Sequence, residues 1–197
     1  MRYEPEHKEQ TRQKVLRAAA RAIRVEGPHR VAVAKVMARA GLTVGGFYAH
    51  FSSKDDLIAA AIDQMFAEGQ SRVLLETAGR APVEALTSYF DFYLSPLHRD
   101  ARATGCPMPS LAADLPRLTA RARERFAAGV AGLRRRIAEQ LGRLGHDDAD
   151  AEASSVIAEL VGALSLARAE PDGAASDAIL ANSKASLKRR LNLETHL

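Results

Sequence analysis

Residues 31–51 read VAVAKVMARAGLTVGGFYAHF, and this stretch decides the fold. Apolar side chains at helical spacing predict a short helix over 33–39, and Gly41 permits the left-handed backbone of a tight turn. A second short helix is expected over 44–51, with the hydroxyl of Thr43 as its cap. Two short helices joined by a glycine-containing turn are the pattern of a helix-turn-helix, whose second helix enters the major groove of DNA.

Helical periodicity continues on both sides of this stretch. A first helix is predicted over 7–25, ended by Gly27-Pro28, and a fourth over 53–66, capped by Ser52 or Ser53. No alternating strand pattern occurs, so the expected class is all-α, with about nine helices. The remaining helices are predicted over 82–95, 106–114, 115–144, 147–169 and 176–191.

Positive charge is concentrated at the start of the chain. Residues 1–56 carry a net charge of +5, and residues 57–197 a net charge of −1. A local basic surface is expected for a protein that binds a polyanion, although a solvated basic helix has the same composition. Arg2, Lys8 and Arg12 are candidates to reach a DNA backbone or minor groove, with solvent exposure as the alternative for each.

Composition argues against several other classes of protein. No apolar run is long enough to span a bilayer, and the first residues lack the apolar core of a signal peptide, so a cytoplasmic protein is expected. The single cysteine, Cys106, excludes an intrachain disulfide. The six histidines are scattered without metal-ligand spacing, and no Gly-x-Ser-x-Gly motif is present. We expect no enzyme, no cofactor and no metal.

Three short motifs carry a resemblance to a known family. They are AGLT at 40–43, GGFYAHF at 45–51 and SKDDL at 53–57. Together they resemble the signature of the TetR family of transcriptional regulators, over about residues 8–66. The resemblance implies an N-terminal three-helix bundle with a helix-turn-helix over 1–54, and a larger C-terminal helical domain for effector binding and dimerisation over 55–197.

The same resemblance implies a function. It predicts a homodimer that binds a double-stranded, (pseudo)palindromic DNA operator, acts as a repressor, and is released by a small organic effector. The helix over 53–66 would link the DNA-binding and effector-binding regions. Two alternatives stay open: a redox or electrophile sensor that acts through Cys106, which lies between Gly105 and Pro107 near Arg99 and Arg102, and a helical adaptor with no DNA role.

The predicted DNA contacts divide into two kinds. Thr43, Tyr48, His50 and Lys54 are expected at phosphates. The start of the second helix, Val44-Gly45-Gly46, lacks the side chains that usually read bases. We expect the glycines to allow close backbone approach, with specificity from methyl groups, the preceding helix and DNA shape. Two glycines weaken this helix by up to ~2 kcal/mol, so it is expected to firm up on DNA. The predicted set is Lys35, Arg39, Thr43, Val44, Gly45, Gly46, Phe47, Tyr48, His50 and Lys54, where Phe47 either meets a base edge or packs the core.

Aromatic residues of the middle section predict an apolar pocket for a flat, moderately polar organic effector. Its candidate residues, each with core packing as the alternative, are Phe66, Tyr89, Tyr93, His98, Cys106, Met108 and Phe126. The last two helices have small and apolar faces that suit a four-helix dimer interface. The residues predicted to form this interface are Val156, Leu160, Ala163, Leu164, Ala167, Ile179, Leu180, Ser183 and Leu187.

Overall fold

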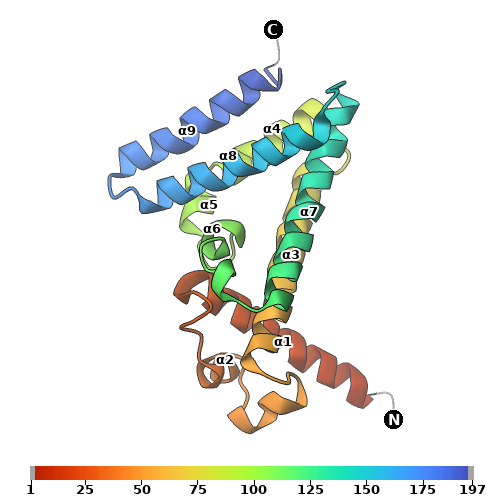
Figure 1. The fold of residues 1–197 in the computed structure, drawn as a ribbon, viewed down its shortest axis with the longest axis vertical. Coiled ribbons are helices and arrows are strands. Elements are labelled where there is room, and N and C mark those ends of the chain that lie inside the picture. Colours follow the sequence, from red (N-terminus) through yellow and green to blue (C-terminus); the bar gives the residue numbers. More distant parts are fainter. Residues whose placement is uncertain (1–2, 195–197) are drawn as a thin grey trace. The chain divides into compact units, whose positions relative to one another are not determined.

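The computed structural model describes residues 3–194, which are helical throughout apart from turns and loops (Figure 1). This confirms the predicted all-α class. Arg2 lies outside the described residues. The elements within the described range are α1 (Tyr3–Glu26), α2 (Val33–Arg39), η1 (Val44–Ala49), α3 (Lys54–Thr77), α4 (Pro82–Tyr93), α5 (Pro96–Asp100), α6 (Met108–Leu111), η2 (Leu115–Arg117), α7 (Ala120–Arg143), α8 (Ala149–Ala169) and α9 (Gly173–Arg190).

The chain divides into two compact units. The first contains residues 1–68 and 106–129, and the second contains residues 69–105 and 130–197. Both α3 and α7 run without interruption from one unit into the other. The domain boundary predicted between residues 54 and 55 separates DNA binding from effector binding and dimerisation, and it stays a prediction.

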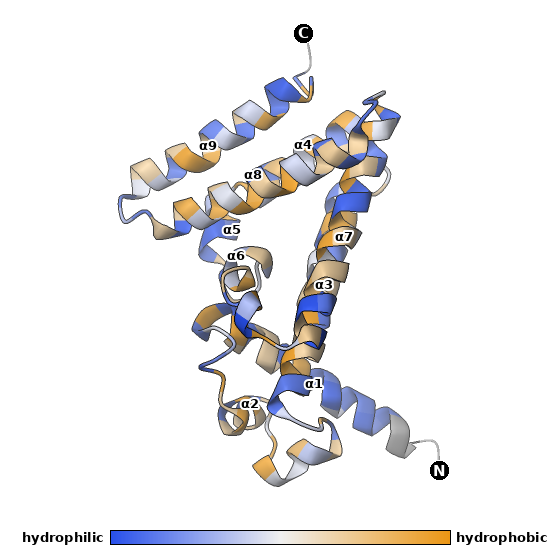
Figure 2. Ribbon diagram, in the orientation of Figure 1, coloured by the Kyte–Doolittle hydropathy of each residue, from blue (hydrophilic) through white to orange (hydrophobic). Residues whose placement is uncertain are grey.

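In the first unit, α1 packs one apolar face inward and leaves a basic face outside. Val15, Ala19 and Ile23 are fully buried on the inner face, and Figure 2 shows that the N-terminal half of α1 is mostly hydrophilic. The guanidinium of Arg24 is buried as well: it pairs with Glu68 at 2.8 Å and donates to the Met65 carbonyl at 3.3 Å. A buried cation needs such partners, and here they join α1 to α3.

The turn of the helix-turn-helix forms as predicted. Gly41 has a φ of +75°, which favours glycine, and the Leu42 amide closes the turn on the Met37 carbonyl at 2.9 Å. The next segment differs from the prediction, because η1 is a 3-10 helix rather than an α-helix. Two adjacent glycines favour the α-helix weakly. The predicted cap is also wrong, because the Thr43 side chain makes no capping hydrogen bond.

The start of α3 is capped as predicted. The Ser53 hydroxyl accepts from the Asp56 amide at 3.0 Å, and the Asp56 carboxylate accepts from the Ser52 amide at 3.1 Å. The bond from the Ser52 amide is the main cause that lowers the pKa of Asp56. Asp56 also pairs with Arg121 at 2.8 Å. The helix itself extends to Thr77, beyond the predicted end at 66.

Residues 94–120 are more broken than predicted. Pro96 begins α5, whose cap Ser95 accepts from the His98 amide at 3.1 Å, where only a break was expected. The predicted helix over 115–144 is divided, because Leu118 is extended between η2 and α7. Thr119 then caps α7 through the Ala122 amide at 3.3 Å.

Within the first unit, α3 and α7 approach closely at Gly129. A Cβ added at Gly129 would lie 2.3 Å from the Phe66 ring, a distance that no real contact shows. Phe66 also meets Phe126 edge-on, with ring centroids 5.4 Å apart. Only glycine therefore fits at position 129 in this packing.

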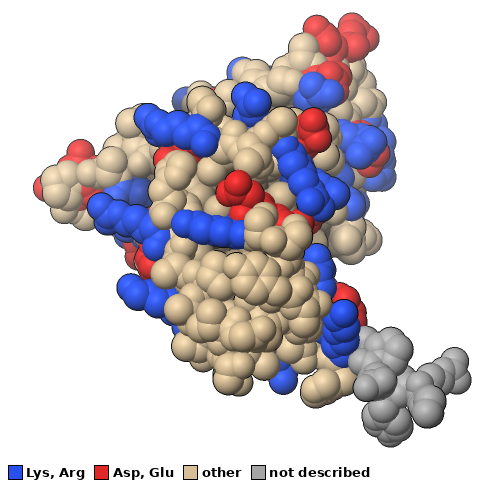
Figure 3. All heavy atoms as spheres, turned by 60° about the horizontal axis from the view of Figure 1, so that its bottom comes forward, with Lys and Arg blue, Asp and Glu red and all other residues tan. Residues whose placement is uncertain are grey.

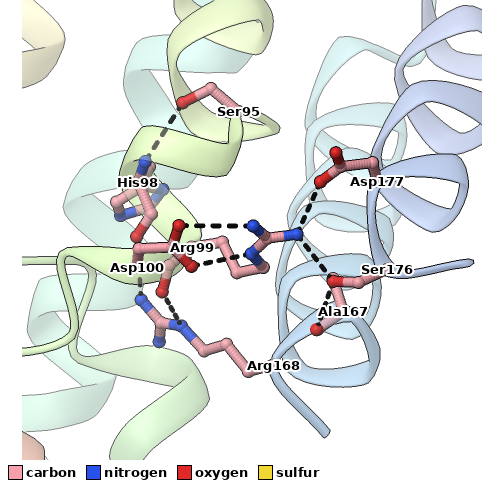
Figure 4. Close-up of polar contacts among 8 residues, drawn as sticks. All are labelled: Ser95, His98, Arg99, Asp100, Ala167, Arg168, Ser176 and Asp177. Carbon is pink, nitrogen blue, oxygen red and sulfur yellow. Dashed lines mark hydrogen bonds and ion pairs between the residues drawn. The ribbon is translucent and has the colours of Figure 1, made fainter. Parts of the chain in front are cut away.

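In the second unit, α8 and α9 lie side by side and are joined to α5 by polar contacts (Figure 4). Arg99 of α5 donates to the Asp177 carboxylate at 2.6 Å and to the Ser176 hydroxyl at 2.8 Å. Arg168 of α8 donates to the His98 and Arg99 carbonyls at 3.2 and 3.1 Å. These bonds satisfy carbonyls at the end of α5 that have no partner within their own helix.

Candidate DNA-binding surface and ligand pocket

The outer face of η1 exposes an aromatic residue. Tyr48 is 77% exposed, and its ring lies edge-on to Phe47 with centroids 5.2 Å apart. Thr43, Val44 and Gly45 are exposed beside it. Figure 3 shows a largely uncharged surface on the part of the molecule that lies at the bottom of Figure 1, with Lys and Arg around its edges. Such a surface can enter a groove while the basic margin meets phosphates.

Phe47 anchors this segment from inside. It is only 2% exposed, and its ring stacks on Phe51 with centroids 5.7 Å apart. Of the two roles left open by the sequence, the structure favours core packing, and a DNA contact of Phe47 stays a prediction. Gly46, which neighbours it, is half-buried near the Met37 side chain.

The three predicted basic contacts differ in their surroundings. Lys54 donates to the His29 carbonyl at 3.0 Å, and Arg39 pairs with Glu26 at 2.8 Å. Lys35 is exposed, and within the described residues its ammonium makes no ion pair or hydrogen bond. Lys35 is therefore the most available of the three, while the other two would need to exchange a partner for a phosphate.

His50 lies between η1 and α1. Burial, followed by the nearby charges of Lys8 and Arg12, lowers its pKa, so the ring is neutral at pH 7. Among the residues that the structure describes, its Nδ1 is buried and has no hydrogen-bond partner. The Arg12 guanidinium lies over the Phe51 ring, 5.1 Å from its centroid. Lys8 and Arg12 thus lie beside the C-terminal end of η1.

The predicted effector residues do not gather in one unit. Phe66, Cys106, Met108 and Phe126 belong to the first unit, and Tyr89, Tyr93 and His98 belong to the second. In the second unit the rings of Tyr89 and Tyr93 lie 5.8 Å apart, and Tyr93 meets His98 at 4.8 Å. Burial lowers the pKa of His98 to about 4, and its Nδ1 lies 2.8 Å from the Tyr93 carbonyl, so the ring is a neutral donor.

A pocket of about 230 Å³ opens in the second unit between α3, α4 and α7. Of the predicted effector residues, Tyr89 lines it. The sequence reasoning missed its other members, since they come from three helices far apart along the chain. The sequence carried one signal, the apolar run Val73-Leu74-Leu75, of which Val73 and Leu74 line the pocket. The lining residues are Val73, Leu74, Thr77, Ala78, Leu86, Tyr89, Arg136, Ile137, Glu139 and Gln140.

The residues predicted for dimerisation mostly face inward. Ile179 and Ser183 are half-buried, and the other seven are buried within the protomer, so the predicted role of these residues in a dimer interface stays a prediction. The seven are Val156, Leu160, Ala163, Leu164, Ala167, Leu180 and Leu187.

The outer side of α8 carries small residues, in contrast to its buried side, where large apolar residues are common. Ala158, Gly162 and Leu166 follow one another at helical spacing, and Leu166 is 63% exposed. A Cβ added at Gly162 would meet nothing within 4 Å.

Within residues 3–194, no helix combines the length and the apolar character that crossing a membrane requires.

A short helix, a glycine turn and an exposed second helical segment define a helix-turn-helix DNA-binding protein. The family comparison gives the particular class. The family model described as "Bacterial regulatory proteins, tetR family" matches residues 15–61. A second model, "Transcriptional regulator LmrA/YxaF-like, C-terminal domain", matches residues 82–181, which is more than half of the chain. The chain belongs to the TetR family of transcriptional regulators.

Solved structures agree on the fold. A TetR transcriptional regulator from Chloroflexus aurantiacus is 26% identical, with a TM-score of 0.81 over 95% of this chain and 96% of that one. E. coli NemR in its reduced form is 21% identical, with a TM-score of 0.79 over 91% and 96%. A TetR regulator from Cytophaga hutchinsonii is 19% identical, with a TM-score of 0.80 over 93% and 96%. A search of curated proteins returned no match.

Proposed function

We propose that this TetR-family regulator binds an operator as a homodimer, represses transcription from it, and leaves it when a small organic effector binds the C-terminal domain. The observation that carries the DNA-binding part is Tyr48, a 77% exposed tyrosine on a segment that the buried Phe47 anchors. An exposed phenol on a firmly held backbone is suited to donate to a phosphate oxygen.

The DNA contacts follow from what is available on this surface. Thr43 and Tyr48 would donate hydroxyls to phosphates, and Lys35 would supply an unengaged charge. Lys8 and Arg12 would extend the positive surface along α1 and release counterions on binding. Gly45 and Gly46, with the Val44 methyl groups, would lie against base edges, so specificity would depend on contacts to thymine methyls and on DNA shape.

The dimer would use the outer sides of α8 and α9. Ala158, Gly162 and Leu166 form a ridge of small residues with one exposed leucine, which allows a second α8 to approach closely. Two such protomers would present paired DNA-reading segments to two half-sites.

Effector release would act through the equilibrium between two arrangements of the C-terminal domain. An effector shifts this equilibrium only by binding one arrangement better than the other. The helix α3 contributes Val73, Leu74 and Thr77 to the pocket, and its first turn follows η1. We propose α3 as the element that transmits the change, and we propose no enzymatic activity.

The test is a salt titration of binding to DNA that flanks the protein's own coding region. We expect a protected site at low salt and an affinity that falls steeply as salt increases. Tyr48→Phe should weaken binding about tenfold, because one charge-assisted hydrogen bond to phosphate is lost. Leu75→Ala is the matched control, since it removes an exposed side chain from the other unit. Absence of any protected site, or equal affinity for Tyr48→Phe and the control, would contradict the proposal.

A further inference from the structure

The pocket between α3, α4 and α7 has an apolar wall. Val73, Leu86 and Ile137 are buried and line it from three different helices. Leu74 lies at its outer edge, where 46% of the residue is exposed. At about 230 Å³ the pocket is smaller than typical ligand sites of about 300 to 1,000 Å³, so its size suits a small molecule with a hydrocarbon body.

One cation lines this apolar pocket. Arg136 is half-buried, and it makes no hydrogen bond or ion pair in the part of the chain that the structure describes. Its guanidinium is a planar fork of donors that matches the two oxygens of a carboxylate. An arginine at the edge of an apolar wall is therefore complementary to a molecule with an acidic head.

A second donor lies one turn further along α7. The side-chain oxygen of Gln140 accepts from Arg143 at 3.1 Å, which leaves the amide nitrogen of Gln140 as the end available to the pocket. Residues 136 and 140 share one face of the helix. Glu139 also lines the pocket and would repel an anion, but its side chain is exposed and water screens its charge.

A second hollow in the described part of the second unit shows the contacts of arginines with a structural role. It has a volume of about 360 Å³, and its lining includes the exposed Arg102 as well as Arg99 and Arg168. Arg99 is held there by Asp100 and Asp177, and Arg168 donates to two carbonyls (Figure 4). These guanidiniums join helices to one another. Arg136 makes no such contact with another helix within the described residues.

We propose that the pocket between α3, α4 and α7 binds a small organic acid. The hydrocarbon body of the acid lies between Val73, Leu86 and Ile137, and its carboxylate is bound by the Arg136 guanidinium and the Gln140 amide nitrogen. The proposal deepens the proposed function, on which it rests in one respect: the same acid is taken to be the effector.

The first experiment compares three probes of nearly equal shape on the unmodified protein by calorimetry: phenylacetate, phenylacetamide and phenethylamine. We expect phenylacetate to bind at least about tenfold more tightly than the amide, since only the acid forms charge-assisted hydrogen bonds. The amine should bind no better than the amide. Equal affinity of acid and amide, preference for the amine, or no binding of phenylacetate at millimolar concentration would each overturn the proposal.

The second experiment assigns the charge to one residue. Arg136→Gln should weaken phenylacetate binding about tenfold and leave phenylacetamide binding unchanged. Arg135→Gln is the matched control, because Arg135 is the adjacent arginine on the same helix, is exposed and does not line the pocket. Equal loss in both variants, or no loss in Arg136→Gln, would overturn the assignment.

A DNA readout separates this proposal from the function on which it rests. Phenylacetate that binds through Arg136 without releasing flanking DNA would support the acid site and contradict effector release. DNA that is bound in a salt-dependent way by a protein that takes no organic acid would overturn the acid site and leave the regulator function standing.

Discussion

The reading segment η1 and the helix pair α8–α9 meet solvent in opposite ways. In η1, one buried ring holds a short backbone from which an aromatic side chain projects. In α8 and α9, the large apolar side chains turn into the protomer, and small ones with Leu166 remain outside. A projecting polar tip suits the backbone of DNA, whereas a smooth small-residue surface suits close approach of another helix.

The comparison has a consequence for energetics. Changes to exposed residues of η1 should alter binding and leave the free energy of unfolding almost unchanged. Changes on α8 should alter either protomer stability or association, depending on which side of the helix carries the residue.

The largest expected effect lies in α8. Leu164→Ala should lower the free energy of unfolding by about 2–5 kcal/mol, because Leu164 is fully buried. Leu166→Ala should change it by less than about 0.5 kcal/mol at protein concentrations where the chain is monomeric, and should weaken association. Urea unfolding and analytical ultracentrifugation measure the two effects. A Leu164→Ala protein as stable as the parent would show that the two sides of α8 are not distinguished in this way.

A second effect comes from two histidines: His50 at the end of η1, and His98 of α5, whose carbonyl accepts from Arg168 of α8. Burial lowers the pKa of His98 to about 4, against about 6.5 in an unfolded chain. As the pH falls, the unfolded state binds the proton before the folded state does. The contribution of His98 to the free energy of unfolding is therefore largest above pH 6.5 and decreases as the pH falls toward 4. From pH 7 to pH 5, His98 should account for about 2 kcal/mol of that decrease.

The measurement is urea unfolding of the parent and of His98→Gln at both values of pH. Glutamine can keep a donor near the Tyr93 carbonyl, which lies 2.8 Å from His98 Nδ1. The variant should lose about 2 kcal/mol less than the parent. His50→Gln is the comparison at the end of η1. His50 is only half-buried, whereas His98 is buried, so we expect a weaker pH effect at His50. Identical pH dependence in the parent and His98→Gln would contradict the account.

A smaller effect is expected at the glycines of η1. A Cβ added at Gly45 would meet nothing within 4 Å, so Gly45→Ala should keep the fold and stabilise it by up to about 1 kcal/mol. If the backbone lies against the groove floor, the same change should weaken DNA binding about tenfold. Gly173→Ala at the start of α9, which also meets nothing, is the control. Unchanged DNA affinity in Gly45→Ala would remove close backbone approach from the recognition mechanism.

The smallest effect is expected at Cys106, a half-buried thiol. Cys106→Ser should change neither unfolding nor DNA affinity by more than about 0.5 kcal/mol, because the two side chains are nearly equal in volume. The alternative that Cys106 is a redox or electrophile sensor stays a prediction, and a further experiment tests it. If that thiol senses oxidants or electrophiles, DNA release by them should disappear in Cys106→Ser while phenylacetate binding is kept.

The accuracy of the sequence predictions followed the range of the interactions involved. The glycine turn at Gly41, the bounds of α2 and the Ser53 cap depend on neighbours within a few residues, and all three were predicted. The 3-10 geometry of η1 was not predicted. Two adjacent glycines indicate that an α-helix is weakly favoured, but they do not indicate which geometry replaces it. The break at Leu118 was missed because Pro116 can begin a helix as readily as end one.

Sites built across helices were harder to predict. Periodicity identifies the apolar residues of α8, but it does not say whether they meet α9 or a second protomer. The pocket residues Val73, Leu86 and Arg136 come from three helices, so no local pattern brings them together. Tyr89 was found among its lining residues because aromatic side chains are common at such sites.

The closeness of α3 and α7 at Gly129 bears on how the sequence can change over time. The volumes at positions 66 and 129 are shared, because the phenylalanine ring occupies the space that any side chain at 129 would need. A methyl group gained at 129 becomes tolerable only after the ring at 66 is exchanged for something smaller, such as leucine. Relatives of this protein should therefore vary at the two positions together, with bulk traded from one helix to the other.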